Sequence, residues 1–213
     1  MAVDRFMAQL LKDGELEIEP YTDMQSRVEN YVKSYLNDYL NEGVEAIDNY
    51  GDDIEATATW MSYEQSIIGK AIYNQDGLLS YQMTLSSYTG GAHGNFNTYN
   101  GVFNLETRES VALESLFDTM SYGDLNAMLQ RKLADQYECE TVQELTTKAS
   151  FFAPEELEAN DNFYIDETGI TWTFDPYEIA PFSEGTIVVS LTWDDVYPLL
   201  RGEAPVMKLA VNH

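Results

Sequence analysis

Apolar residues at helical spacing predict two helices at the start of the chain. The first is expected at 3–11, with Gly14 after it as a C-terminal glycine. The second is expected from about residue 24 to about Tyr50, behind a capping box of Thr22 and Gln25. Its apolar stripe consists of Met24, Val28, Tyr31, Val32, Tyr35, Leu36, Tyr39 and Leu40. We interpret its tyrosines as core-lining rings with hydroxyls at the rim.

From residue 54 the hydrophobic period changes to two, which predicts strands. One strand is expected at 54–60, and a hairpin at 67–73 and 79–85 around a four-residue turn at 74–77. The polar side of its second strand is expected to be exposed or covered by a groove. That side is formed by Ser80, Gln82, Thr84 and Ser86. Two more strands are expected, at 96–105 and through Val111 and Leu113.

The C-terminal part mixes helices with a second hairpin. A helix is expected from about 121–124 to Tyr137, and a short one follows a capping box of Thr141 and Glu144. The stretch 151–162 reads as irregular and acidic. The last elements are a hairpin at 163–165 and 170–174, a strand at 187–191 and a helical turn at 193–200.

This order of elements predicts the fold class. Helices come first and hairpins follow, without the alternation of strand and helix that marks a parallel sheet. We therefore expect an α+β fold, with an antiparallel sheet of hairpins and helices packed on one face. Residues 1–85 form its N-terminal helices and first hairpin, and residues 86–213 form the C-terminal part. The two parts are expected to make one compact unit.

Composition excludes several classes of partner. The 213 residues include 11 Lys and Arg against 37 Asp and Glu, a formal charge of −26. Such a surface repels phosphate backbones and anionic lipids, so nucleic acid is excluded as an expected partner. Two explanations of the charge stay open, which are solubility and the steering of a cationic partner.

Cysteine usage and the chain start bear on the compartment. Cys139 is the only cysteine, so it forms no internal disulfide, and we expect a buried or half-buried thiol. No apolar run reaches the roughly 18 residues of a membrane span. The first five residues lack the basic and apolar regions of a signal peptide, which taken alone indicates a cytoplasmic protein. A start at Met1 in place of a removed export segment is the alternative.

The residue inventory disfavours most catalytic chemistry. His93 and His213 are the only histidines, so histidine-dependent catalysis would have to use His93. No Gly-x-Ser-x-Gly elbow, zinc-ligand spacing or phosphate-binding glycine loop with its lysine is present. The acidic run 48–53 lacks the residue order of a calcium loop. We expect no metal and no cofactor.

Two motifs resemble a known family. The first reads Tyr-Thr-Gly-Gly-Ala-His-Gly at 88–94, and the second reads Phe-Asp-Pro-Tyr-Glu-Ile-Ala-Pro-Phe at 174–182. Between them stand Phe-Asn-Leu at 103–105 and Val-Ala-Leu-Glu-Ser-Leu-Phe at 111–117. The set resembles the extracytoplasmic domain of RsiV-type anti-sigma factors, which bind lysozyme. It also resembles the noncatalytic N-terminal module of PdaC-type peptidoglycan deacetylases, and the domain occurs alone in bacterial lipoproteins of unknown function.

The resemblance implies an exported α+β domain of the cell envelope whose described activity is binding. It further implies a signal sequence, with a lipobox cysteine, upstream of Val3 in the full-length protein, and contact with the membrane only through that lipid anchor. The chain departs from the family in lacking an opening strand, a membrane segment and a deacetylase domain with its His-x-x-x-His motif. Neither sigma-factor control nor deacetylation is therefore carried over.

The two motifs supply the candidate binding residues, which are Tyr88, Gly91, His93, Tyr177 and Glu178. We expect the imidazole of His93 to be structural, buried under the 177–181 loop. The first functional hypothesis is a noncatalytic binding module for a cell-wall glycan or peptide, or for a basic protein such as lysozyme. The second is a hydrolase of peptidoglycan or peptide with His93 as general base. The third is a structural envelope component.

Overall fold

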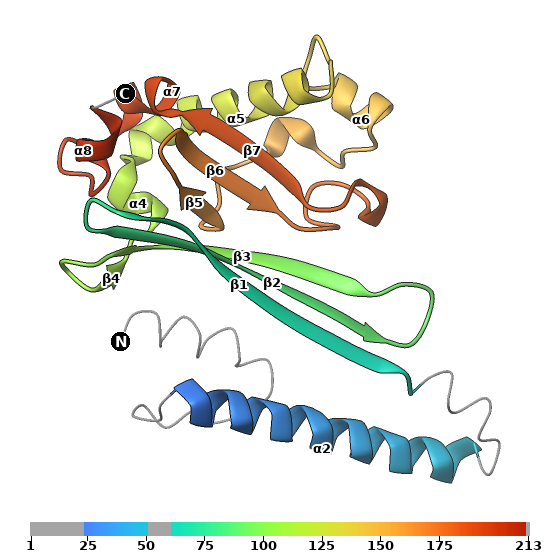
Figure 1. Ribbon diagram of the computed structural model, residues 1–213. Coiled ribbons are helices and arrows are strands. Elements are labelled where there is room, and N and C mark those ends of the chain that lie inside the picture. The colour runs from blue at the N-terminus through green and yellow to red at the C-terminus, as the bar shows by residue number, and fades with distance from the viewer. Residues whose placement is uncertain (1–23, 51–60, 212–213) are drawn as a thin grey trace. The chain divides into compact units, whose positions relative to one another are not determined.

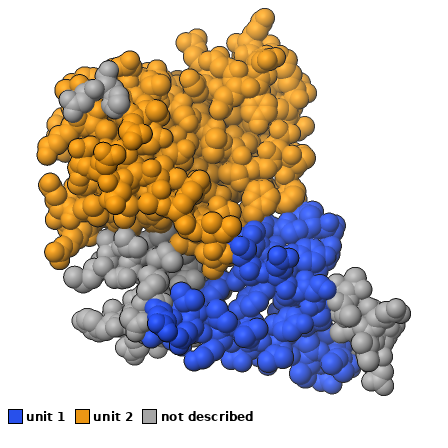
Figure 2. All heavy atoms as spheres, viewed as in Figure 1, with its two compact units in different colours: residues 1–66, 86–95 blue, residues 67–85, 96–213 orange. Residues whose placement is uncertain are grey.

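The computed structural model describes residues 24–50 and 61–211 (Figure 1). The helix predicted at 3–11, the cap at Thr22 and the strand predicted at 54–60 lie outside the described residues. Contacts divide the chain into two compact units (Figure 2). Unit 1 comprises Met1–Ser66 and Ser86–Asn95, and unit 2 comprises Ile67–Leu85 and Phe96–His213. The single compact unit expected from the sequence stays a prediction.

Unit 1 contains helix α2, Met24–Tyr50, whose predicted extent is confirmed. Two tyrosines about two turns apart attach this helix to the beginning of strand β1, Tyr63–Gln75. The hydroxyl of Tyr31 donates to Oε1 of Gln65 over 2.6 Å. The ring of Tyr39 meets the ring of Tyr63 edge-on, with centroids 5.3 Å apart. The tyrosine side of the predicted stripe therefore faces the strand.

A four-stranded sheet has the order β1-β2-β3-β4. Its other strands are β2, Leu78–Thr89; β3, Asn95–Asn104; and β4, Glu109–Ser110. The boundary between the units crosses β1 and β2, so both strands contribute residues to each unit. The first hairpin turn is tighter than predicted. Asp76 and Gly77 alone form it, with φ of 54° and 76°, as a primed hairpin turn requires.

The strand predicted through Val111 and Leu113 is wrong, because the strand at this place, β4, ends at Ser110. Leu113 begins helix α4, Leu113–Leu116, and its backbone N–H donates to Oδ1 of Asp161 over 2.9 Å. The apolar alternation that suggested a strand arises because Val111, Leu113 and Leu116 are all buried in the core. A 3-10 turn, η1, Thr119–Ser121, then leads into the next helix.

Unit 2 contains a second antiparallel sheet, of order β5-β6-β7. Its strands are β5, Phe163–Ile165; β6, Gly169–Phe174; and β7, Ile187–Thr192. The predicted hairpin is confirmed, with Ile165 opposite Ile170. Helix α5, Tyr122–Gln136, packs against β7 (Figure 1). The predicted α+β class is confirmed, and the strands are distributed over two sheets.

The predicted polar side of β2 is not wholly open. Ser80 is completely buried, and its hydroxyl accepts the backbone N–H of Ile165 over 3.0 Å. This bond joins the middle of β2 to β5 within unit 2. A buried hydroxyl with such a partner avoids the cost of an unsatisfied polar group. The part of the β2 prediction that left Ser80 exposed or beside a groove is therefore wrong.

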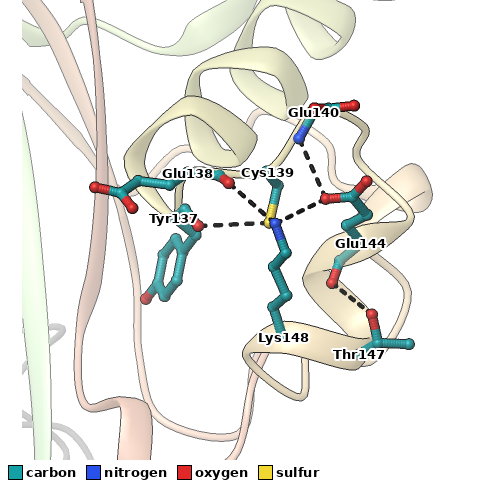
Figure 3. A network of polar contacts seen from close by, with 7 residues as sticks. All are labelled: Tyr137, Glu138, Cys139, Glu140, Glu144, Thr147 and Lys148. Carbon is teal, nitrogen blue, oxygen red and sulfur yellow. Dashed lines mark hydrogen bonds and ion pairs between the residues drawn. The ribbon is translucent and has the colours of Figure 1, made fainter.

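The end of α5 is tied to the short helix α6, Glu144–Lys148, by polar contacts (Figure 3). The ammonium of Lys148 donates to the carbonyl of Glu138 over 3.0 Å and pairs with Glu144 over 2.9 Å. That ammonium lowers the pKa of the Glu144 carboxyl.

The expected burial of Cys139 is confirmed. The capping box expected at Thr141 is wrong, because Gln143 occupies the N-cap and makes no side-chain bond there.

The chain continues through irregular segments and short helices. These are η2, Pro154–Glu156; η3, Phe182–Glu184; α7, Trp193–Val196; η4, Tyr197–Leu199; and α8, Met207–Ala210. A full capping box stands at α7, where Thr192 and Asp195 bond reciprocally. Among the helices of the described ranges, none is long and apolar enough to cross a membrane.

Candidate functional site

The first glycine motif borders an open pocket of about 620 Å³ in unit 1. We name it the glycine-turn pocket. Its walls come from three elements that the fold of unit 1 brings together. They are the C-terminal half of α2, the beginning of β1 and the end of β2 with the turn after it. The lining residues are Glu42, Ala46, Met61, Tyr63, Tyr88, Thr89, Gly90 and Gly91.

A hydrogen bond between Tyr63 and Glu42 sets the electrostatics of this pocket. The hydroxyl of Tyr63 donates to Oε2 of Glu42. This bond, with a smaller contribution from burial, raises the pKa of Tyr63 to about 12. Burial, then the charge of Glu42, also raises the pKa of Tyr35, which lies about two turns before Glu42 on α2 and has a buried hydroxyl oxygen. Both phenols are therefore neutral near pH 7, and the pocket carries one carboxylate.

The glycine turn shapes the opposite wall of the pocket. Gly90 and Gly91 have φ of 87° and 96°, a region that favours glycine. The hydroxyl of Tyr88 donates to the carbonyl of Gly91 over 3.0 Å, which closes the turn. Gly94 is needed for a different reason, since a Cβ there would lie 2.9 Å from the carbonyl oxygen of Ser87. Two predicted residues, Tyr88 and Gly91, thus meet at this pocket.

The prediction that His93 is buried is wrong. The residue is exposed, and Nδ1 lies 2.8 Å from the carbonyl oxygen of Gly94, the next residue along the chain. The glycines on either side of His93 turn the chain outward, so the imidazole stands at the surface of unit 1 and makes this local contact. It is not among the residues that line the pocket.

The other two predicted residues, Tyr177 and Glu178, lie in a loop of unit 2 that begins at Asp175. Tyr177 has φ of 71° and is 60% exposed, and its ring lies tilted against that of Phe182, with centroids 5.8 Å apart. Glu178 points back into the loop, where its carboxylate accepts from the backbone N–H of Asp175 over 2.9 Å and from Asn160 over 3.1 Å. Its two oxygens therefore hold the loop closed. Glu178 also borders a smaller pocket, of about 280 Å³, with Phe152 and Ile179.

The sequence analysis missed the polar contacts along the part of the β3 edge that the two-residue strand β4 leaves uncovered. The carboxylate of Asp175 accepts the backbone N–H of Thr98, with its oxygens at 2.9 and 3.0 Å. The amide of Asn162 accepts from the N–H of Asn100 over 2.8 Å and donates to the carbonyl of Thr98 over 2.7 Å. These side chains replace a neighbouring strand. The Asp-Pro of the second motif pointed to a fixed loop, but nothing in the sequence indicated its partner.

No group of three or more His, Cys, Asp or Glu residues in the described ranges is placed to hold a metal ion. The chemistry available at the glycine-turn pocket is therefore aromatic, hydrogen-bonding and weakly anionic. Tyrosine rings offer flat faces, Glu42 offers an acceptor, and the Gly90–Gly91 turn offers backbone groups.

Comparison with protein families accounts for both motifs. Residues 17–96 match the family described as "Deacetylase PdaC", and residues 114–194 match the "Protein of unknown function (DUF3298)" family. The first stretch is thus similar to the PdaC family and the second to the DUF3298 family. The resemblance inferred from the sequence motifs is thereby confirmed. The glycine-turn pocket lies within the residues that match PdaC, whereas Tyr177 and Glu178 lie within those that match DUF3298.

Solved structures show the same fold. A DUF3298 family member from Bacteroides fragilis matches with a TM-score of 0.81 and 22% identity, over 98% of this chain and 80% of that one. A DUF3298 family protein from Pseudomonas aeruginosa matches with a TM-score of 0.55 and 14% identity, over 67% of this chain and 64% of that one. At such identities the likeness establishes the fold alone. Among curated proteins, none matches the chain.

Proposed function

We propose that the chain is a noncatalytic binding module of the bacterial cell envelope, exported and held by a lipid anchor. Its glycine-turn pocket recognises a short cell-wall glycopeptide. The observation that carries the proposal is the lining of that pocket, where Tyr63 and Tyr88 stand with Glu42 and the Gly90–Gly91 turn. The match of residues 17–96 to the PdaC family supports an envelope location. A ligand from peptidoglycan follows from the resemblance that the sequence motifs carry.

The proposed ligand follows from the chemistry of the lining. Sugar rings present flat C–H faces that pack on aromatic rings, and acetamido and hydroxyl groups need acceptors and donors. Glu42 supplies an acceptor, and the backbone of the glycine turn is accessible because it carries no side chains. A pocket of about 620 Å³ lies within the range of small-molecule sites, so it holds a glycopeptide of a few units.

The net charge of −26 separates this ligand from a basic protein such as lysozyme. A basic protein would be attracted by the whole surface, so its association rate would fall about tenfold or more from low to high salt. A glycopeptide held in the pocket is neutral or carries carboxylates, so it would lose no affinity at high salt. The salt dependence of binding therefore decides between the two ligands.

Calorimetric titration with a purified disaccharide-tetrapeptide tests the proposal. We expect saturable binding in 20 mM and 500 mM NaCl, and mass spectrometry of the recovered ligand should show it unchanged. The variant Tyr88→Ala should weaken binding about tenfold or more, through loss of a ring and of the bond that closes the turn. Asn49→Ala, at an exposed position of α2, is the matched control.

Two results would contradict the proposal in different ways. Cleavage of the glycopeptide that His93→Ala abolishes would favour the hydrolase alternative. Absence of glycopeptide binding, together with salt-dependent capture of lysozyme, would favour a receptor for basic proteins.

A further inference from the structure

The outer side of α2 carries a continuous apolar stripe that the described fold leaves exposed. Its side chains range from 46% exposed, at Val28, to 61% exposed, at Leu40. The members of this stripe, which we name the α2 stripe, are Val28, Val32, Leu36, Leu40, Val44 and Ile47. Scattered exposed apolar residues are ordinary, but a contiguous row on one helix marks an interaction surface.

The spacing of the α2 stripe fits a second helix of the same kind. Five of its members follow one another every four residues, which forms a ridge along the helix. Two such ridges interdigitate when helices cross at about −50°. The stripe spans residues 28–47, on the order of 28 Å at 1.5 Å per residue. At that angle the contact is centred on the crossing point, so Leu36 and Leu40 are buried most deeply, with Val32 and Val44 beside them.

The stripe is also nearly symmetric about its centre. If two α2 helices run antiparallel, Leu36 faces Leu40 of the second copy and Val32 faces Val44. These central apolar residues meet apolar residues, as a two-fold axis near residue 38 requires of a self-complementary surface.

Charge along α2 selects the antiparallel direction. Residues 24–37 contain Arg27, Lys33 and Glu29, a net charge of +1. Residues 38–50 contain Asp38, Glu42, Glu45 and Asp48, a net charge of −4. Antiparallel pairing places the weakly basic half of one helix beside the acidic half of the other, whereas parallel pairing places the acidic halves together. The helix dipoles favour the same direction.

We propose that the α2 stripe is the interface of a homodimer, in which the α2 helices of two copies pack antiparallel around a two-fold axis. Each copy carries a charge of −26, so long-range repulsion opposes association and salt weakens that repulsion. The dimer is therefore expected to be tighter at high salt than at low salt, unlike a complex between oppositely charged partners.

Dimerisation would also affect the proposed binding of glycopeptide, although this consequence rests on the proposed function. Glu42 and Ala46 of α2 line the glycine-turn pocket, so a dimer joined through α2 carries two such pockets. A polymer with a repeating unit could then engage both, which raises the effective concentration at the second site. The dimer itself is tested without any ligand.

Sedimentation equilibrium of the full chain is the first test. We expect a monomer–dimer equilibrium whose dissociation constant is at least tenfold lower in 500 mM than in 20 mM NaCl. The double variant Leu36→Asn, Leu40→Asn should raise that constant about a hundredfold, because four leucines leave each interface. The variant Asn37→Gln, Asn41→Gln changes exposed positions beside the stripe and should leave the constant unchanged. Circular dichroism checks that both variants retain the helix.

Cysteine cross-linking tests the direction of packing. In a Cys139→Ala background, a mixture of Leu36→Cys and Leu40→Cys chains should form the mixed disulfide faster than either symmetric one. Faster symmetric cross-links would indicate parallel packing and overturn the antiparallel arrangement. A chain that stays monomeric at every salt concentration up to 200 µM would overturn the dimer, and another part of the chain or a different protein would then cover the stripe.

Discussion

The carboxylate of Asp175 receives the backbone N–H of Thr98 through both of its oxygens, at 2.9 and 3.0 Å. This contact ties the loop of the second sequence motif to the free edge of β3, within unit 2. An open strand edge is a template for unwanted pairing, and side chains that occupy it protect the fold. Asp175 of the second sequence motif therefore has a structural role.

The first prediction concerns the stability of this contact. Asp175→Ala should lower the free energy of unfolding by about 1–3 kcal/mol, because the N–H of Thr98 loses its partner. Asp175→Asn keeps one acceptor oxygen and should lose less. Urea unfolding measures both, and equal losses for the two variants would contradict the assigned role of the oxygen atoms.

The pH dependence of the same residue is a second prediction. Burial raises the pKa of the Asp175 carboxyl above its usual value of 3.8, against the opposing effect of the Thr98 hydrogen bond. A raised carboxyl pKa means that the folded state binds the proton more tightly than the unfolded state, so protonation stabilises the fold. Lowering the pH from 7 to 4 should therefore raise the stability of the wild type relative to Asp175→Asn. A wild-type stability that falls relative to that of Asp175→Asn when the pH is lowered would contradict this sign.

A third prediction concerns Asn162, whose amide stands in for a strand beside Thr98 and Asn100. Asn162→Ala should destabilise the protein by about 1–3 kcal/mol, because backbone groups of β3 lose their partners. Asn49→Ala, at an exposed position of α2, should change stability by less than about 0.5 kcal/mol. Equal effects of the two variants would exclude a role for Asn162 at the strand edge.

The fourth prediction concerns the glycine turn. Gly94→Ala should cost about 1–3 kcal/mol, since the new methyl would lie 2.9 Å from the carbonyl oxygen of Ser87. Gly123→Ala is the control, because open space surrounds that position in α5 and alanine favours helix. Chemical denaturation should show destabilisation only for Gly94→Ala. His93→Ala, at an exposed position, should stay within about 0.5 kcal/mol of the wild type.

Local patterns in the sequence predicted much of the fold. The helical spacing through Leu36 and Leu40 gave α2, and the alternation around Asp166–Gly169 gave the β5–β6 hairpin, because both depend on near neighbours. The sequence did not predict that Ser80 is buried, since its partner, Ile165, is far along the chain. It also did not separate the two sheets.

The candidate site was predicted in part for the same reason. Tyr88 and Gly91 were found through their motif, and they line the glycine-turn pocket. Glu42 and Tyr63 were missed, because their contribution depends on how α2 meets β1 in three dimensions. The exposure of His93 was missed because glycines on both sides permit a tight turn and an open one equally.

Amide chemical shifts during titration with the disaccharide-tetrapeptide test the central claim most directly. We predict that the largest shifts fall on Tyr63 and on residues 88–91, and that they saturate with the calorimetric affinity. The variant Tyr63→Phe keeps the ring but loses the bond to Glu42, and it should weaken binding while preserving the pattern of shifts. Saturable binding whose shifts lie wholly outside the lining of the glycine-turn pocket would contradict the account.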